Sequence, residues 1–158
     1  MKTPRKKMII GLDLGLTTGW ALLFPNGTIE SGTYEIPEDR GESRGMRFAR
    51  WRGWFIGLLE DWQPGLVAYE QAHARGGAAT DVLVGLATRV QECCAERGIE
   101  YVPIHTSTLK KWATGNGAAK KAAMVEAATA RAGRTIESDD EADAYLVVCL
   151  AAEKWGEG

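Results

Sequence analysis

The sequence predicts a single α/β domain, built on a mixed five-stranded sheet that opens with a three-strand meander and has helices on both faces. Two observations predict this class. Three strand-like segments come first along the chain with no helix between them, and helices then alternate with strands. Strands joined by short turns pair antiparallel, whereas strands joined through a helix pair in parallel, so the sheet must contain both kinds of pairing.

The meander occupies the first third of the chain. Short segments rich in apolar or β-branched residues predict strands over residues 8–14, 20–24 and 28–36. Between the second and third strands, Pro25-Asn26-Gly27 predicts a hairpin turn, because Asn-Gly tolerates the positive φ that tight hairpins need. The turn between the first two strands is expected to contain Gly15, Thr17, Thr18 and Gly19.

The rest of the chain is predicted to alternate between helices and strands. A first helix over residues 43–62 is indicated by the helical spacing of four apolar residues, Trp51, Phe55, Leu58 and Trp62. The later elements are expected to be strands at 66–71 and 100–104 and helices at 80–97, 106–113, 118–132 and 139–154. This organisation predicts one domain over residues 8–154, with a basic extension at 1–7 and a short tail at 155–158.

Composition limits the class of protein. With 158 residues, 45% hydrophobic and 25% charged, the chain is typical of one soluble globular domain. No apolar segment approaches the roughly 18–20 residues of a membrane span, and a strand stands where a signal peptide would have its apolar region. A cytoplasmic location and no membrane partner are therefore expected. Cys93, Cys94 and Cys149 lie in helical patterns and are predicted to be buried, reduced thiols.

Four carboxylates lie at the ends of predicted elements. Asp13 and Glu70 each end a short apolar run, and Asp140 and Asp143 open the last helix. Acids at the ends of buried strands are poorly solvated, and together they raise one another's pKa unless divalent cations hold them. Hard oxygen ligands suit Mg²⁺ or Mn²⁺. The pattern therefore predicts two-metal phosphodiester chemistry.

Two alternatives apply to parts of this set. Ser138 and Glu141 form an S-x-x-E capping box, so Asp140 and Asp143 could serve only the start of the helix. Their spacing of three nevertheless puts both on one side of the helix, and Asp139 is the acid expected at the cap. Separately, the segment DLGLTT that begins at Asp13 is similar to the first phosphate loop of actin-like ATPases and sugar kinases. Those proteins need a second domain and a second phosphate loop, which this chain lacks.

Three motifs occur in a fixed order: GLDLGLTTGWA at residues 11–21, VAYEQ at 67–71 and DEADA at 140–144. In this order they resemble RuvC-type Holliday junction resolvases of the ribonuclease H-like superfamily, in the short form found in bacteriophages and prophages. The resemblance covers roughly residues 8–154. It implies a ribonuclease H-like fold with a central first strand, and a structure-selective endonuclease that cleaves branched DNA. It further implies two Mg²⁺ or Mn²⁺ ions held by Asp13, Glu70, Asp140 and Asp143.

The resemblance also implies a homodimer, formed through the helix at 80–97, and cuts that leave 5′-phosphate and 3′-hydroxyl ends. Basic residues near the acids would contact DNA. Lys120 follows a glycine-bearing loop similar to the family's and is predicted to neutralise the scissile phosphate, with Lys121 as the other candidate. Lys110 and Lys111 match a neighbouring basic position. The net charge is only −2, so local patches must provide the positive potential.

Further DNA contacts are expected from Arg44 and Arg47, which begin the first helix on the side of Trp51. A loop after the second acid carries His73 and Arg75. Cellular RuvC proteins place an aromatic residue at the position of His73, so we expect the imidazole to be a weaker wedge in the junction. Three-way junctions and forks should then also be cut.

Two other functions fit the same fold. One is a branched-DNA-binding protein that has lost cleavage, although four retained acids argue against it, because clustered acids are costly without metal. The other is a nuclease that cuts RNA–DNA hybrids.

Overall fold

The computed structural model describes residues 6–71 and 77–156, and it contains the predicted mixed sheet. The strands are β1 (Ile9–Asp13), β2 (Thr17–Leu23), β3 (Ile29–Glu35), β4 (Leu66–Gln71) and β5 (Glu100–His105), in the spatial order β3-β2-β1-β4-β5. The pairs β1–β2 and β2–β3 are antiparallel, and the pairs β1–β4 and β4–β5 are parallel. The central position of β1 is thereby confirmed.

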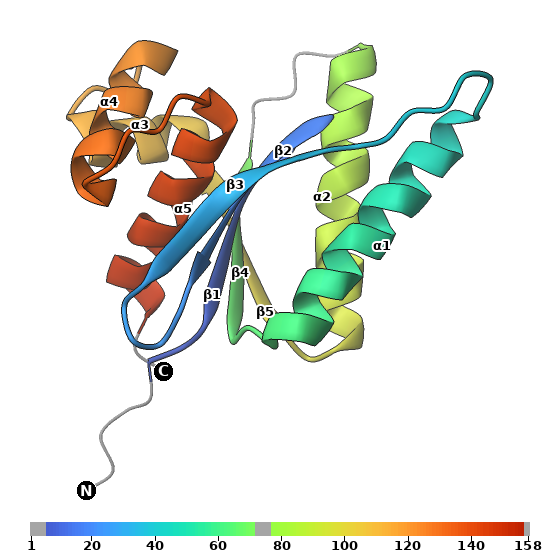
Figure 1. Cartoon of the computed structure of the whole chain (residues 1–158), viewed down its shortest axis with the longest axis horizontal. Helices are drawn as coiled ribbons and strands as arrows, with labels where there is room; N and C mark the ends of the chain where they lie inside the picture. The colour runs from blue at the N-terminus through green and yellow to red at the C-terminus, as the bar shows by residue number, and fades with distance from the viewer. Residues whose placement is uncertain (1–5, 72–76, 157–158) are drawn as a thin grey trace, which may run out of the picture.

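Helices cover both faces of the sheet, as Figure 1 shows. On one face lie α1 (Arg44–Trp62) and α2 (Ala78–Glu96), and on the other lie α3 (Thr106–Thr114), α4 (Lys121–Ala132) and α5 (Asp139–Trp155). The helix α5 packs directly on the sheet across β1, β2 and β4. None of the helices in the described residues is long and apolar enough to cross a membrane.

Each face of the sheet has its own apolar core. Ile9 and Ile10 are neighbours in β1 and are both fully buried, the first in the core beneath α5 and the second in the core beneath α1 and α2. This is why β1 is a continuous apolar run rather than an alternating one. Trp51 of α1 fills the second core, and its indole N–H donates to the buried Thr18 hydroxyl at 2.9 Å. The three cysteines are free thiols; Cys93 and Cys94 are buried as predicted, whereas Cys149 is half-buried.

Three details differ from the sequence prediction. The strand β2 begins at Thr17 rather than Trp20, because three of the residues expected in the turn, Thr17, Thr18 and Gly19, pair with β3, and Gly19 also pairs with Asp13. The helix α4 begins at 121 rather than 118, because the side chain of Asn116 accepts the Ala118 N–H at 2.9 Å and holds a turn there. In α1 the buried residues are Trp51, Phe55 and Leu59, whereas Trp62 is 40% exposed.

Candidate metal centre

Three carboxylates from three elements meet at the carboxyl end of β1. Asp13 ends β1, Glu70 lies near the end of β4, and Asp143 lies in the second turn of α5. One carboxylate oxygen from each residue lies within 4.8 Å of the other two. The parallel strands β1 and β4 deliver their acids to the same edge of the sheet, and α5 begins over that edge. The structure thus brings together three of the four predicted acids as one group.

Asp140, the fourth predicted acid, lies beside this group. Its carboxyl group lies close enough to that of Asp13 to raise the pKa of Asp13, and its negative charge also acts on Glu70 and Asp143. The backbone explains this placement. Gly19 pairs with Asp13 in the sheet, and the Asp140 carbonyl lies over Gly19 so closely that an added Cβ would be 1.9 Å from the carbonyl oxygen.

Burial raises the pKa of every acid in the cluster. For Asp13 burial is the largest cause, and the charges of the neighbouring acids raise the pKa further. Burial also leads at Asp143, followed by the charge of Glu70, and the pKa rises to about 7. The pKa of Glu70 is raised by burial, against a hydrogen bond from Thr106 and the positive charge of Lys110. Such shifts are typical of functional sites, and here they indicate too little positive charge for the acids present.

The chemistry of these acids fits a hard divalent cation. Among the described residues, Glu70 Oε2 and Asp143 Oδ1 are buried oxygens with no hydrogen-bond partner. Burying a charged oxygen without a partner is costly, and a bound cation would remove that cost. Carboxylate oxygens are the ligands that Mg²⁺ and Mn²⁺ prefer. The cluster is therefore a candidate site for such ions.

Lys110 of α3 is the lysine whose charge acts on the acids of both β4 and α5. It lowers the pKa of Glu70 and of Asp143. The resemblance to the resolvases gave it only a neighbouring basic position, but its place near the acids could have been inferred from the sequence. Thr106 begins α3 directly after β5, and Lys110 lies four residues later, one helical turn along the same side.

The other predicted lysines lie farther along the chain. Lys121 begins α4 and forms an ion pair with Asp139, with 3.3 Å between Nζ and Oδ2. Lys120 is the exposed N-cap residue of α4, and Lys111 is exposed on α3.

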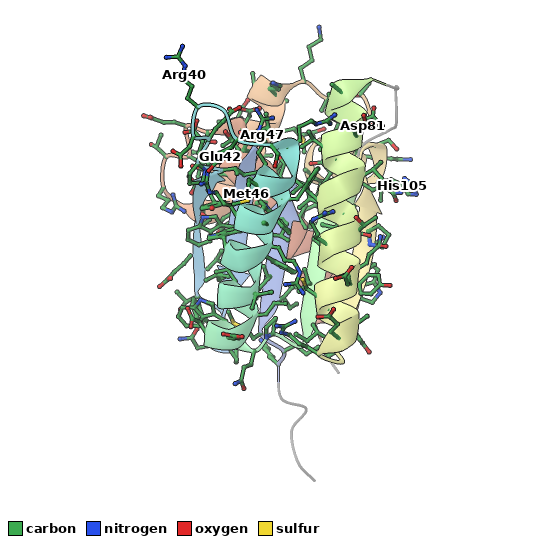
Figure 2. The ribbon with its side chains drawn as sticks, turned by 90° about the vertical axis from the view of Figure 1, so that its right-hand side faces the viewer. Arg40, Glu42, Met46, Arg47, Asp81 and His105 are labelled. Carbon is green, nitrogen blue, oxygen red and sulfur yellow. The ribbon has the colours of Figure 1, made fainter. Side chains whose placement is uncertain are left out.

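The predicted arginines of α1 pair with acids of the chain itself. Arg47 forms an ion pair with Glu38, and Arg44 lies 3.9 Å from a carboxylate oxygen of Asp81 in α2. Figure 2 shows Arg47 and Asp81 at the same end of α1 and α2. These acids partly neutralise the arginine-rich segment that the sequence predicted as a DNA contact. His73 and Arg75 were also predicted to contact DNA. Both lie outside the residues that the structure describes.

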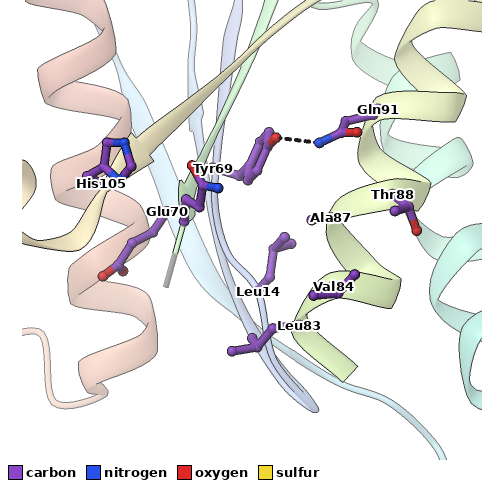
Figure 3. A pocket seen from close by; sticks show the side chains of 10 residues that line it. Leu14, Tyr69, Glu70, Leu83, Val84, Ala87, Thr88, Gln91 and His105 are labelled. Atoms are coloured by element: carbon purple, nitrogen blue, oxygen red, sulfur yellow. Dashed lines mark hydrogen bonds between the residues drawn. The ribbon is translucent and has the colours of Figure 1, made fainter. Parts of the chain in front are cut away.

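A cavity of about 340 Å³ lies between β4, at Tyr69 and Glu70, and α2, and Figure 3 shows it from close by. Gln91 donates to the Tyr69 hydroxyl across its inner end at 2.9 Å. The Glu70 carboxyl group points away from the cavity towards α5, whereas Leu83 and Val84 face it from α2. The cavity therefore adjoins Glu70, and α2 lines its opposite side with the apolar side chains of Leu83 and Val84.

Gly19→Ala is expected to disturb the acid cluster without removing an acid. The added methyl group would collide with the Asp140 carbonyl, so the first turn of α5 must move. We expect the free energy of unfolding to fall by about 1–3 kcal/mol, as for other overpacked sites. Urea denaturation measures this, and Mn²⁺ binding should weaken in the same variant.

The matched control is Gly57→Ala in α1, where an added Cβ meets nothing within 4 Å. Alanine should there be neutral or stabilising, because it is the better helix former. Equal unfolding free energies for the two variants would contradict the close approach of α5 to β2.

No protein-family model and no curated protein sequence matches this chain. Thermus thermophilus RuvC in complex with a Holliday junction substrate has a TM-score of 0.78 at 18% identity, over 92% of this chain and 93% of that one. Another T. thermophilus RuvC structure has a TM-score of 0.73 at 17% identity, over 95% and 98% of the two chains.

The yeast mitochondrial Holliday junction resolvase has a TM-score of 0.54 at 14% identity, over 91% of this chain and 78% of that one. These matches cover nearly the whole length of the chain, and they agree with its strand order and with the helices on both faces. The chain therefore has the ribonuclease H-like fold, in the form seen in the RuvC resolvases.

Proposed function

We propose that this protein is a metal-dependent endonuclease that cleaves branched DNA, with the four-way Holliday junction as its main substrate. One observation carries the proposal. Three carboxylates from β1, β4 and α5 lie within 4.8 Å of one another, and two of them have buried oxygens without a partner in the described chain. The likeness in fold to a RuvC protein bound to a Holliday junction substrate supports the choice of DNA.

In this proposal Asp13, Glu70, Asp140 and Asp143 hold two Mg²⁺ or Mn²⁺ ions. Bound ions of this kind supply a water of lowered pKa as nucleophile and stabilise charge on the leaving oxygen. The chain contributes rigid placement, because Asp13 and Glu70 lie at or near the ends of paired strands and the other two acids lie on a helix packed against those strands. Products would be nicks with 5′-phosphate and 3′-hydroxyl ends.

The basic residues would bind the DNA around these acids. Lys120 is proposed to neutralise charge on the scissile phosphate, with Lys121 as the other candidate, and Lys110 joins them because of its effect on the acids. Beyond the acid cluster, the proposed contacts are Lys111, Arg44, Arg47, His73 and Arg75. Arg44 and Arg47 would have to exchange their acidic partners for phosphates. Forks and flaps are proposed as further substrates, and a phage or prophage origin stays a prediction.

Replacing Lys120 by alanine tests its role. We expect single-turnover cleavage of a junction to slow by about 100-fold, as when one group that stabilises transition-state charge is removed. Junction binding should change far less. Lys121→Ala is the comparison for the neighbouring candidate, and Lys154→Ala, at the far end of α5, is the control. Equal rates for Lys120→Ala and Lys154→Ala would remove Lys120 from the mechanism.

We also propose that the protein is a homodimer, because two cuts on opposed strands need two active sites. The helix α2 supports this proposal. Leu86 and Val90 are buried against the sheet, whereas Val84 is 54% exposed and Leu83 lines the neighbouring cavity. The helix thus has apolar side chains that the described residues leave partly uncovered, and a second copy of α2 would cover them.

Light scattering at micromolar concentration should therefore give a mass of twice 17.2 kDa. Val84→Glu should shift the mass towards that of one chain, because an unpaired charge would be buried between the two helices. Met46→Glu is the control, since Met46 is a similarly exposed apolar residue on α1. A single-chain mass for the wild type would refute the dimer.

The proposed function is tested with a labelled synthetic four-way junction, incubated in Mg²⁺ beside a three-way junction, a flap, a linear duplex and an RNA–DNA hybrid. We expect cleavage of the four-way junction, little cleavage of the duplex, and no cleavage in EDTA. Nicked products should be sealed by DNA ligase, which requires a 5′-phosphate. Preferential cutting of the hybrid, or junction binding without cleavage in both Mg²⁺ and Mn²⁺, would replace this proposal with one of the two alternatives.

A further inference from the structure

A network of three side chains joins α5 to the edge strand β3, one residue away from Asp140. The carboxylate oxygen Oε2 of Glu141 accepts hydrogen bonds from Ser31 Oγ at 2.7 Å and from Arg134 Nη2 at 3.0 Å. Arg134 also donates to Ser31 Oγ at 2.5 Å. The Glu141 side chain is only 16% exposed, compared with 46% for Arg134. The carboxylate is thus enclosed at the contact between α5 and β3.

Glu141 does not complete the capping box that its spacing from Ser138 predicts. In a capping box the glutamate side chain returns to the backbone N–H of the N-cap residue. Here the first half is present, since Ser138 Oγ accepts the Glu141 N–H at 3.3 Å. The carboxylate instead bonds to Ser31 and Arg134. Its contacts therefore stabilise the packing of the helix on the sheet as well as the helix end.

Two contacts hold the start of α5 on two neighbouring strands. The Asp140 carbonyl lies over Gly19 of β2, and the Glu141 carboxylate bonds to Ser31 of β3. Gly19 pairs with Asp13, and Ser31 pairs with Ala21, two residues farther along β2. The close contact at Gly19 limits how near α5 can lie to the sheet, but it is not a hydrogen bond that would resist rotation of the helix. The bond to Ser31 provides one, because rotation of α5 about its axis would break it.

We infer that Ser31, Arg134 and Glu141 are positioning residues that fix the rotation of α5 and so hold Asp140 and Asp143 against Asp13 and Glu70. The inference rests on the proposed function, since it assumes that these acids bind metal. Residues that fix the orientation of metal ligands contribute to metal affinity even though they do not contact the ion. Glu141 also adds a negative charge near the site, so a test must separate charge from position.

Ser31 makes that separation possible, because Ser31→Ala removes the hydrogen bond and leaves every charge in place. The experiment measures Mn²⁺ binding to the full chain without DNA, by electron paramagnetic resonance of free Mn²⁺ and by calorimetry. We expect Ser31→Ala to raise the Kd for Mn²⁺ about three- to tenfold, below the larger losses seen when a direct partner of a ligand is removed. Ser31→Thr keeps the hydroxyl group and should restore wild-type affinity.

Two further variants complete the series. Glu141→Gln should weaken Mn²⁺ binding at least as much as Ser31→Ala, because it loses the charge and the ion pair with Arg134. Glu153→Gln is the matched control, since that carboxylate also accepts a side-chain hydrogen bond, from Trp112 Nε1 at 2.8 Å, but lies near the other end of α5. Its Kd should equal that of the wild type. If Glu141→Gln fails to fold, Arg134→Gln takes its place.

The outcomes separate this inference from the proposed function. Weaker binding in Ser31→Ala, with recovery in Ser31→Thr, supports positioning. Weaker binding in Glu141→Gln alone assigns the effect to charge and overturns the inference, as does a lower melting temperature with unchanged Mn²⁺ affinity in Ser31→Ala. If the wild type itself binds no Mn²⁺, the proposed function fails and the inference fails with it.

Discussion

Asp13→Asn should lower junction cleavage by several orders of magnitude while leaving the fold and junction binding intact. Asp13 ends the central strand, and its carboxylate is one of the three that lie within 4.8 Å of one another. Asparagine keeps the shape of the side chain but carries no charge, so the variant should lose affinity for divalent cations. Because metal activation of water is the proposed source of the nucleophile, the chemical step should fail before DNA binding does.

Three measurements check this result. Single-turnover cleavage in Mg²⁺ gives the loss of rate, and gel-shift assays in EDTA give the affinity for the junction. Thermal melting in EDTA should show that the variant is at least as stable as the wild type, because one repelling charge has been removed from a buried cluster.

Asp61→Asn, an exposed acid on α1, is the control and should keep the wild-type rate and melting temperature. The four-carboxylate mechanism is wrong if Asp13→Asn cleaves junctions at a rate near that of the wild type.

The metal-free protein should become less stable as the pH rises through neutrality, and Mg²⁺ should restore the stability. Burial, followed by the charge of Glu70, raises the pKa of Asp143 in the folded protein to about 7, above its ordinary value of 3.8. Between these values the folded state binds more protons than the unfolded state. Stability from this group is therefore fully present below about pH 4 and is lost as the pH rises through about 7. The raised pKa of Asp13 acts in the same direction.

Melting temperatures at pH 5 and pH 8, in EDTA and in Mg²⁺, test this dependence. In EDTA we expect the melting temperature to be roughly 5–10 °C lower at pH 8 than at pH 5, the scale of a few kcal/mol in a domain of this size. Mg²⁺ should raise it strongly at pH 8 and little at pH 5, where protons compete for the same oxygens.

Asp143→Asn isolates the contribution of this acid, since other titrating groups remain unchanged. Its melting temperature in EDTA should depend less on pH than that of the wild type, and Mg²⁺ should stabilise it less. An EDTA melting temperature that is equal or higher at pH 8 in the wild type would show that the cluster is not repulsive.

The order of the elements and the placement of two acids could be predicted from the sequence alone. Residues 8–14 form an apolar run because both faces of β1 are covered, and this pattern depends only on neighbouring residues. Once β1 and β4 are predicted to be parallel neighbours, Asp13 and Glu70 must lie at the same edge of the sheet. Such inferences succeed because strand period and crossover geometry are local or topological rules.

Other features depended on packing that no local pattern contains. The Asn116 turn delays the start of α4, and the acidic partners of Arg44 and Arg47 come from a loop and from α2. The ion pairs of Arg44 and Arg47 and the effect of Lys110 on the pKa of the acids cannot be predicted from the charges along the sequence. Long flexible side chains form their contacts only once the elements have packed.

The clearest division lies within the first turn of α5. The sequence determined that a helix starts near Ser138, because an N-cap residue and acids in the first turn stabilise the helix end locally. Only the tertiary structure decided that Glu141 bonds to Ser31, 110 residues away, and that Asp140 lies over Gly19. Local interactions fix where a helix begins. Its rotation on the sheet is fixed by contacts between segments that are distant in the chain, and this rotation determines where the side chains of Asp140 and Asp143 lie.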